Sequence, residues 1–443
     1  MRRVLAAALA AVEPGRAVRA AARVEDGALL VGARRYPLSQ LRRIVVVGAG
    51  KASAPMAAAI EDLLQLQLQL QLQGDAPPVA GLVVVRYGHA VPTRRVRIIE
   101  AAHPIPDAAG VAATGEIAAL LQDADERDLV LCLISGGGSA LLTLPVAGLS
   151  LDDLRQTTDA LLRSGATINE INTLRKHLDE VKGGGLARLA APAPLVTLIL
   201  SDVVGNPLDA IASGPTVPDT TTWADVGGVL DRYQLWEAVP PSVRERTRAG
   251  LAGELPDTPK PGAALFDHVQ TEVVGSNLLA CQAAAAEAER LGLRSLILST
   301  FVEGEAREVA KVLAGTLREV HGSGNPLPRP CCLIAGGETT VTVRGAGKGG
   351  RNQELALAAA APLRGLPDVL LASIGTDGND GPTDAAGAWV DGTTLDRARA
   401  AGLDPAQYLA DNDAYAFFAG LDNLVKTGPT NTNVNDLCLM FAF

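Results

Sequence analysis

The residues best suited to bind an anion follow an apolar run at residues 44–47. Gly48 and Gly50 allow the backbone to turn sharply, and Lys51 then stands at the start of a predicted helix. A lysine beside helix N-terminal N–H groups can hold a phosphate or a carboxylate, whereas the alternative is a solvated surface lysine. The segment imitates a dinucleotide-binding turn, but it lacks the third glycine in register and an acidic residue at the end of the next strand.

A second anion site is predicted at the glycine-rich segment that follows the apolar run of residues 129–134. Three consecutive glycines let several backbone N–H groups converge, and a hydroxyl flanks them on each side. The residues of this predicted cradle are Ser135, Gly136, Gly137, Gly138 and Ser139. A tight turn without a ligand is the alternative for such a loop.

Carboxylates follow a third strand-like run, at residues 197–200, which is apolar except for Thr197. Asp202 could hold Mg²⁺ or accept the proton of an attacking hydroxyl, and Asn206 and Asp209 come close behind it. An Asx-turn with a helix cap is the alternative for Asp202. Upstream, Asn172 and Lys176 are four residues apart on one helix face and could reach one ligand, while we interpret His177 as part of a solvated charged helix.

The C-terminal half contributes three further polar segments. Glu338 follows two glycines, and Arg351 opens a predicted helix after a glycine-rich loop, where it is suited to bidentate contact with a carboxylate or phosphate. Asp377 begins an acidic loop that partly mimics a calcium loop, but no glutamate stands at the closing position. Asn433 lies in a polar turn able to bind ligand hydroxyls or to cap the backbone.

These segments require a framework of strands and helices. Apolar strand-like runs alternate with alanine-rich helical stretches, which predicts an α/β fold with mainly parallel sheets covered on both faces. Polar clusters at the carboxyl ends of the runs then predict a shared ligand cleft. The length of 443 residues suggests two domains, and we interpret the polar, proline-rich residues 241–261 as a linker region between domains at 1–240 and 262–443.

Composition narrows the classes of partner. The formal net charge of −10 disfavours a general attraction to nucleic acid or anionic lipid. Five cysteines without CxxC spacing indicate buried free thiols in a reducing cytoplasm. No apolar segment reaches the roughly 18 residues needed to span a bilayer. The N-terminus, despite two arginines and an apolar run, predicts a helix rather than a signal peptide, and the alternating residues 65–73 predict a surface insertion at a helix end.

The motifs taken together, and in this order, resemble the glycerate 2-kinase family of bacteria and animals, which includes members labelled hydroxypyruvate reductases. The resemblance covers nearly the whole chain and is carried by GAGKAS, RYGH, HPIPD, SGGGSALL, INTLRKHL, LSDVVGNPLDAIASGPT, GGETTVTVRGAGKGGRNQE, GTDGNDGPTDAAG and TGPTNTNVNDL. The insertion at residues 65–73 departs from the family but lies outside every motif.

The resemblance implies a fold, a reaction and site residues. The fold is an N-terminal Rossmann-like three-layer α/β/α domain and a C-terminal mixed α/β domain of the MOFRL type, with the active site in the cleft between them. The reaction uses ATP and Mg²⁺ to phosphorylate D-glycerate at its 2-hydroxyl, and Lys51, Arg351 and Asp202 match the catalytic positions. The residues predicted to bind cofactor are Gly48, Gly50, Ser135, Gly136, Gly137, Gly138, Ser139, Asn206, Glu338, Asp377 and Asn433, and the predicted metal ligands are Asp202 and Asp377.

Two other functions stay open at this point. An NAD(P)-dependent hydroxypyruvate reductase would use residues 48–51 as its dinucleotide turn, and a ligand sensor would bind glycerate or nucleotide without turnover. The residues themselves do not decide between the 2- and 3-hydroxyl of glycerate, nor between a monomer and a homodimer. We expect a cytoplasmic protein with a small-molecule substrate and without nucleic acid or membrane partners.

Overall fold

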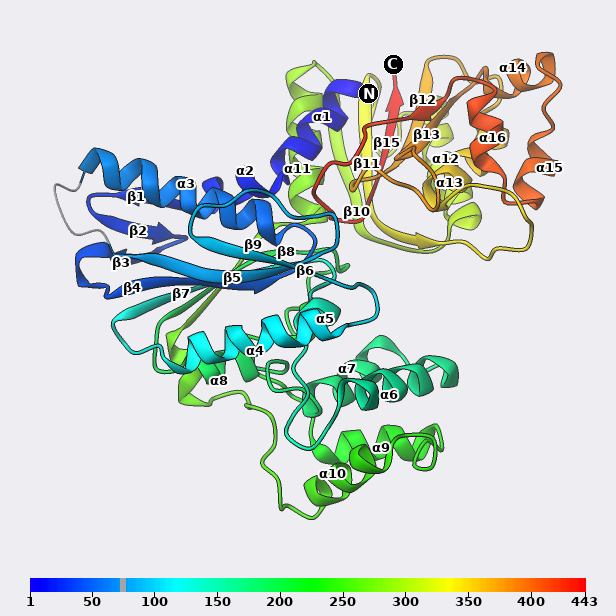
Figure 1. Ribbon diagram of the computed structural model, residues 1–443. Helices are drawn as coiled ribbons and strands as arrows, with labels where there is room; N and C mark the ends of the chain where they lie inside the picture. The colour runs from blue at the N-terminus through cyan, green and yellow to red at the C-terminus, as the bar shows by residue number, and fades with distance from the viewer. Residues whose placement is uncertain (72–76) are drawn as a thin grey trace. The chain divides into compact units, whose positions relative to one another are not determined.

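The computed structural model describes residues 1–71 and 77–443, which form two compact units (Figure 1). The N-terminal unit contains Pro14–Ser201 and Asn206–Val274. The C-terminal unit contains Met1–Glu13, Asp202–Gly205 and Gly275–Phe443. Both units are discontinuous along the chain, whereas the domains predicted from the sequence are continuous.

The N-terminal unit is built on a six-stranded sheet with the strand order β6-β5-β4-β7-β8-β9. The strands are β4 (Arg43–Ala49), β5 (Val79–Arg86), β6 (Val96–Ala101), β7 (Asp128–Ser135), β8 (Leu195–Leu200) and β9 (Val269–Gly275). The pairs from β6 to β8 are parallel. In chain order this is the 3-2-1-4-5-6 arrangement of a Rossmann fold, so the strand order reverses between β4 and β7.

Helices cover both faces of this sheet, which explains why every residue of β7 is buried. In Figure 1, α3 (Ser53–Gln71) lies on one face and α4 (Ala108–Gln122) on the other. The predicted three-layer Rossmann-like fold is confirmed. The remaining elements are α2 (Pro14–Ala21), β1 (Ala22–Glu25), β2 (Ala28–Val31), β3 (Arg34–Pro37), η1 (Leu38–Gln40), α5 (Gly138–Leu141), α6 (Leu151–Ser164), α7 (Ile168–His177), α8 (Gly185–Ala190), η2 (Ile211–Ser213), α9 (Trp223–Arg232), α10 (Pro241–Leu251) and η3 (Ala264–His268).

Residues 241–261, which the sequence predicts as a linker region, contain α10 and belong to the N-terminal unit. Pro241 stands in the first turn of α10, where its fixed φ favours helix initiation and its missing N–H costs nothing. Val243 and Thr247, four residues apart, are buried on one face of the helix. The prolines therefore start a packed helix in this segment.

The C-terminal unit holds a second six-stranded sheet, of mixed direction, in the order β10-β11-β15-β12-β13-β14. The strands are β10 (Arg294–Glu305), β11 (Cys331–Thr340), β12 (Val369–Gly375), β13 (Gly387–Asp391), β14 (Leu424–Val425) and β15 (Asp436–Ala442). Only β10 and β11 are parallel, because the last strand of the chain inserts antiparallel between β11 and β12. The predicted mixed α/β fold of this part is confirmed.

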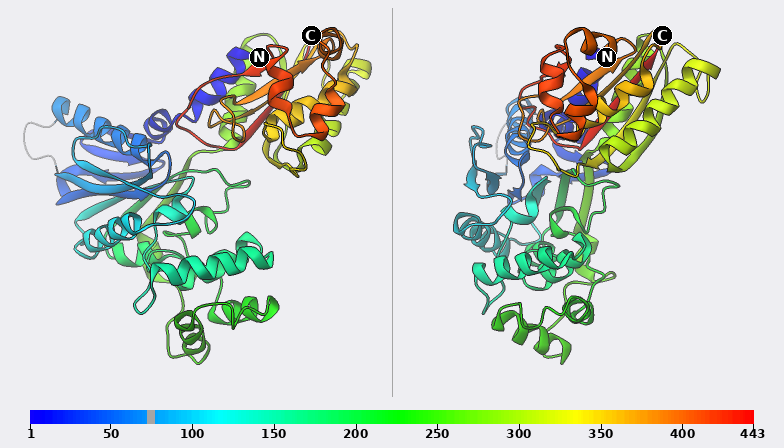
Figure 2. Two further views of the ribbon diagram at one scale, coloured as in Figure 1. Left: turned by 45° about the vertical axis from the view of Figure 1, so that its right-hand side comes forward. Right: turned by 90° about the vertical axis from the view of Figure 1, so that its right-hand side faces the viewer.

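Helices flank the second sheet as well (Figure 2). The helix α11 (Asn277–Arg290) packs on β10 and β11 and carries α1 (Arg2–Ala11), while α12 (Ala306–Ser323) and α13 (Arg351–Leu363) pack together. The apolar faces of α12 and α13 form one core with Leu333, Phe417 and Met440. The smaller helices are α14 (Thr394–Ala400), α15 (Pro405–Ala410) and α16 (Ala414–Ala419).

The N-terminal residues, the cysteines and the described part of the alternating segment 65–73 also have defined places in the structure. The N-terminal residues form α1 and α2, as expected. All five cysteines are free and buried. Within residues 1–71 and 77–443, no helix is long and apolar enough to cross a membrane. The alternating segment 65–73 is helical as far as Gln71, the last residue of α3, and its last two residues lie outside the described residues.

Candidate active site

The turn after β4 and the glycine-rich loop after β7 meet at the point where the strand order of the N-terminal sheet reverses. The N–H of Lys51 donates to the carbonyl of Gly136 at 2.9 Å, and the N–H of Ala52 donates to Ser135 Oγ at 2.9 Å. Gly50 has φ +142, and a Cβ there would lie 2.2 Å from Ser135 Oγ. The close approach of the two loops therefore requires a glycine.

The two hydroxyls of the predicted cradle have different roles. Ser135 is 1% exposed, and its Oγ also lies 3.1 Å from Ser53 Oγ, so this side chain ties β7 to the start of α3. Ser139 is only partly buried, and its Oγ lies 3.1 Å from Ser213 Oγ. Backbone N–H groups at residues 137–139 stand in the first turn of α5 or just before it, where a helix offers no internal acceptor. They can therefore donate to an anion.

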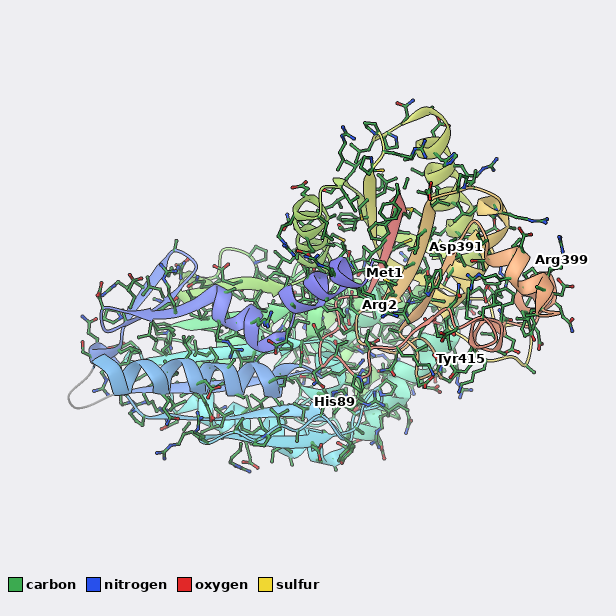
Figure 3. All side chains as sticks on the ribbon, turned by 90° about the horizontal axis from the view of Figure 1, so that it is seen from above. Met1, Arg2, His89, Asp391, Arg399 and Tyr415 are labelled. Carbon is green, nitrogen blue, oxygen red and sulfur yellow. The ribbon has the colours of Figure 1, made fainter. Side chains whose placement is uncertain are left out.

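Two histidines that sequence reasoning did not select lie beside this loop. Gly137 has φ +86, and a Cβ there would lie 2.9 Å from His103 Cδ2, so the imidazole packs directly against the loop. His89, labelled in Figure 3, has Nδ1 3.3 Å from the Lys51 carbonyl. Burial, together with the charges of Lys51 and Arg86, lowers the pKa of His103 to about 4. His103 is therefore neutral at pH 7. His89 ends the motif RYGH and His103 begins the motif HPIPD, so membership in these two motifs is the sequence signal that could have identified them.

The helix α7 presents Asn172 and Lys176 on one face, as predicted. Asn172 Oδ1 accepts from Ser213 Oγ at 3.0 Å, which links α7 to Ser139 through two hydroxyls. Lys176 is buried and pairs with Asp219 at 3.1 Å.

The interpretation of His177 as solvated is wrong. Its ring is buried against Trp223, with Nε2 2.9 Å from Asp257 and Nδ1 2.8 Å from the Thr173 carbonyl. The helical position faces α9 rather than water, so this residue has a structural role.

In the C-terminal unit, Arg351 is the centre of a carboxylate cluster. It begins α13, and its Nε and Nη2 donate to the two carboxylate oxygens of Asp436 at 2.6 and 3.0 Å. Its Nη1 lies 2.9 Å from Glu338 Oε1. Burial acts to lower the pKa of Arg351, but its bonds to Asp436 and the two carboxylate charges outweigh burial and raise it. Arg351 therefore stays charged.

Asn435 joins Asp202 to this cluster. Its Nδ2 donates to the Asp202 carbonyl at 2.8 Å and to Glu338 Oε2 at 3.0 Å. Asn433 shapes the same turn, because its Oδ1 accepts from the Asn435 N–H at 3.1 Å. Partial burial raises the pKa of Glu338, Arg351 opposes this shift, and the charges of Asp436 and Asp202 add to it. Asp202 and Glu338 therefore interact electrostatically.

Asp380 is a buried carboxylate that the sequence placed only in an acidic loop. It accepts from the backbone N–H groups of Asn352 and Gln353 at 3.0 and 2.8 Å, so it holds the first turn of α13. Burial raises its pKa to about 6, although these hydrogen bonds act in the opposite direction. Asp377 lies in the same loop, where its Oδ1 accepts from the Asn379 N–H and its charge raises the pKa of Asp436.

The predicted site residues therefore fall into two groups, one in each unit. The N-terminal unit contains Gly48, Gly50, Lys51, Ser135, Gly136, Gly137, Gly138, Ser139 and Asn206, and the C-terminal unit contains Asp202, Glu338, Arg351, Asp377 and Asn433. Asn206 has a left-handed backbone with φ +53. Among the described residues, no group of three or more His, Cys, Asp or Glu side chains is arranged to hold a metal ion.

Comparisons with known proteins identify two families along the chain. The family described as "Domain of unknown function (DUF4147)" matches residues 1–248, and the MOFRL family matches residues 331–436.

Three related proteins are similar over almost the whole chain. A glycerate 2-kinase of Pyrococcus horikoshii is 43% identical over 99% of this chain and 95% of its own length. An Agrobacterium vitis protein with the provisional name hydroxypyruvate reductase is 44% identical over 99% of this chain and 92% of its own length. A crystal structure of glycerate kinase from Thermotoga maritima has a TM-score of 0.87 at 40% identity and covers 99% of this chain and 98% of that one.

Proposed function

Because this chain belongs to the glycerate 2-kinase family, we propose that it transfers the γ-phosphoryl group of ATP to the 2-hydroxyl of D-glycerate. The observation that carries the proposal is the similarity over nearly the full length to proteins named glycerate 2-kinase, at 43% identity. The two loops that meet at Lys51 and Gly136 support it, because ligands of open α/β sheets bind where the strand order reverses.

Lys51 and the backbone N–H groups of residues 137–139 would hold phosphate groups. A fixed positive charge and pre-oriented N–H groups stabilise the charge that develops on the transferred phosphoryl group. The neutral His103 beside Gly137 can donate a hydrogen bond from one ring nitrogen and accept at the other. Ser139, linked to Asn172 through Ser213, would fix the position of the loop.

Arg351 would bind the carboxylate of glycerate or the phosphoryl group being transferred. Its fork geometry suits both ions, and its pairing with Asp436 and Glu338 holds the guanidinium in place. Asp202 would orient the attacking hydroxyl and accept its proton. These roles are proposals for the individual residues.

Within the described part of the chain, the carboxylates of the C-terminal unit do not form a complete metal site by themselves, but their charge favours a divalent cation that substrate phosphates would also help to hold. The charges of Asp202 and Asp436 act on Glu338, and the charge of Asp377 acts on Asp436. Negative charge therefore exceeds the positive charge of Arg351 in this cluster. Mg²⁺ is usually held by one or two carboxylates together with substrate phosphates, and we propose Asp202 and Asp377 as its ligands. When bound, the ion would neutralise charge on the phosphates.

The reductase alternative has one supporting observation, the name of the Agrobacterium vitis relative. The neighbouring strand β5 ends at Arg86, where an NAD-binding strand would place an acidic residue against the ribose. Because an arginine suits the 2′-phosphate of NADP, NADPH is the cofactor to include in the test. The buried free cysteines support a cytoplasmic location for either enzyme.

The test incubates the purified protein with ATP, Mg²⁺ and D-glycerate, follows ADP release and identifies the product by NMR. We expect 2-phosphoglycerate. Formation of 3-phosphoglycerate would correct the position of transfer, and NADPH oxidation with hydroxypyruvate in the absence of ADP release would replace the kinase by the reductase.

A further inference from the structure

A cavity of about 530 Å³ lies in the N-terminal unit beside the glycine-rich loop. It is lined by the segment 104–106 and by residues of the helices α6 and α7, and it is open to solvent on one side. Polar and apolar residues both line it, but most of its exposed surface is apolar, and the principal apolar residues are Pro104, Ile105, Leu154, Leu161, Leu174 and Leu178. A cavity of this size and character is typical of a small-molecule site.

The cavity borders the proposed phosphate cradle at Ser139. Ser139, the last residue of the loop, lines the cavity together with Ala140 and Thr143 from the turn that follows. Ser139 also belongs to the hydroxyl chain that runs through Ser213 to Asn172. A ligand with its phosphates on the loop could therefore extend an attached group past Ser139 into this cavity.

Arg175 supplies a polar group that the protein itself does not use. Among the described residues, no hydrogen bond or ion pair holds its guanidinium, although it lines the cavity. The neighbouring charges are already paired, because Lys182 bonds Asp179 at 2.6 Å and Arg155 donates to the Pro106 carbonyl at 2.7 Å. A partly buried guanidinium without a partner is costly, and a bound ligand would compensate for it.

Two large aliphatic side chains of the cavity wall are exposed to solvent. Ile105 is 63% exposed and Leu162 is 61% exposed. Because both side chains line one cavity, a ligand bound there could cover them. A flat, mostly apolar group with polar edges can cover these side chains and also reach Arg175.

We propose that this cavity binds the adenine and ribose of ATP, with Arg175 stacked on the base or donating to the nucleoside. The inference rests on the proposed kinase function and adds a nucleoside site to it. The planar guanidinium of arginine stacks on aromatic faces and offers five N–H donors, so it can serve either contact. The aliphatic wall supplies the apolar contact that a purine requires.

The first test compares exposed aliphatic residues of the same unit. In the double variant Ile105→Ala/Leu162→Ala, we expect the KM for ATP to rise about tenfold, which corresponds to about 1.4 kcal/mol. The KM for glycerate and kcat should stay within about twofold. Ile168→Ala is the matched control, because Ile168 is 59% exposed on α7 and does not line the cavity. An unchanged KM for ATP in the double variant would overturn the inference.

Arg175→Met keeps the aliphatic stem and removes the donors. We expect a rise in the KM for ATP without a change in the KM for glycerate, in a variant whose thermal midpoint matches that of the wild type. A rise confined to glycerate would place Arg175 at the other substrate and would overturn its assignment to the nucleoside.

The second test locates the base directly and requires no turnover. The full-length protein is photolabelled with 8-azido-ATP, and the labelled peptides are identified by mass spectrometry. Label within residues 104–106 or 154–182 that ATP competes away supports the inference, and label confined to other segments overturns it. If ADP forms with glycerate but the label lies elsewhere, only the nucleoside site fails. If no ADP forms, the proposed function itself fails.

Discussion

Arg351→Lys is the substitution that tests the carboxylate cluster most directly, because it preserves the charge and removes the fork. In the structure, two nitrogens of Arg351 bind Asp436 at 2.6 and 3.0 Å and a third lies 2.9 Å from Glu338. A lysine ammonium is a point charge on a flexible chain, and it cannot reproduce the two parallel bonds to one carboxylate while also pairing with the other.

The expected loss of stability follows from these contacts. A hydrogen bond to a charged group contributes about 1.5–3 kcal/mol when it is desolvated. The Arg351 side chain is 34% exposed, so screening reduces the loss of one such bond to about 1–2 kcal/mol. For a domain of 150–250 residues this corresponds to a fall in the thermal midpoint of roughly 2–8 °C.

The assay combines thermal unfolding with steady-state kinetics. If Arg351 binds the glycerate carboxylate or the phosphoryl group, kcat/KM should fall about tenfold to hundredfold. The control is Arg364→Lys, since Arg364 pairs with the single exposed carboxylate of Asp396 at 3.0 Å and should lose less than about 0.5 kcal/mol. An Arg351→Lys enzyme that unfolds and turns over like the wild type would refute both the paired geometry and the catalytic role.

Three further predictions follow from the N-terminal unit and the cysteines. Gly50→Ala should prevent folding of the unit, because the new Cβ would lie 2.2 Å from Ser135 Oγ. The control is Gly148→Ala, which has φ +88 and no atom within 4 Å of the new Cβ, and which should lose only about 1 kcal/mol of stability. Soluble yield and circular dichroism distinguish an unfolded variant from a folded one. The pKa of His103 is about 4 in the folded protein and 6.5 in the unfolded chain. Between these two pH values the unfolded chain binds a proton that the folded protein does not bind. The free energy of unfolding should therefore fall as the pH drops from 6.5 to about 4. Urea titrations should show this loss, on the order of 1–2 kcal/mol after screening, in the wild type and not in His103→Asn. Burial raises the pKa of Cys132 to about 12, so a thiol reagent at pH 8 should leave the native cysteines unmodified and should modify all five after denaturation; rapid reaction of the native protein would contradict their burial.

The sequence determined the strands and turns of the N-terminal sheet because their signals are local. Each central strand is a continuous apolar run, and the glycines that must follow β4 and β7 stand beside the runs they terminate. Parallel strands bring their carboxyl ends to one edge, so Lys51 and the glycine-rich loop could be expected together. The resemblance to the glycerate 2-kinases rests on the same local motifs.

Local patterns also misled at two places. The prolines and charges of residues 241–261 indicate a linker, but Pro241 starts α10, whose burial depends on packing against its own unit. His177 has charged neighbours along the chain, yet its ring is buried against Trp223, more than forty residues away in sequence. Periodicity alone does not say which helix face meets another element.

Only the tertiary structure decided the C-terminal cluster and the cavity. Asp436 meets Arg351 because β15 inserts between β11 and β12, a pairing over long sequence separations that no neighbouring residue specifies. His103 lies against Gly137, and Arg175 lines a cavity with residues of the segment 104–106, through the packing of segments that are distant in the chain. The sequence alone determined which residues could do chemistry, since residue type and local backbone are encoded at each position. The structure decided which of them meet, because long-range contacts depend on how complete elements pack.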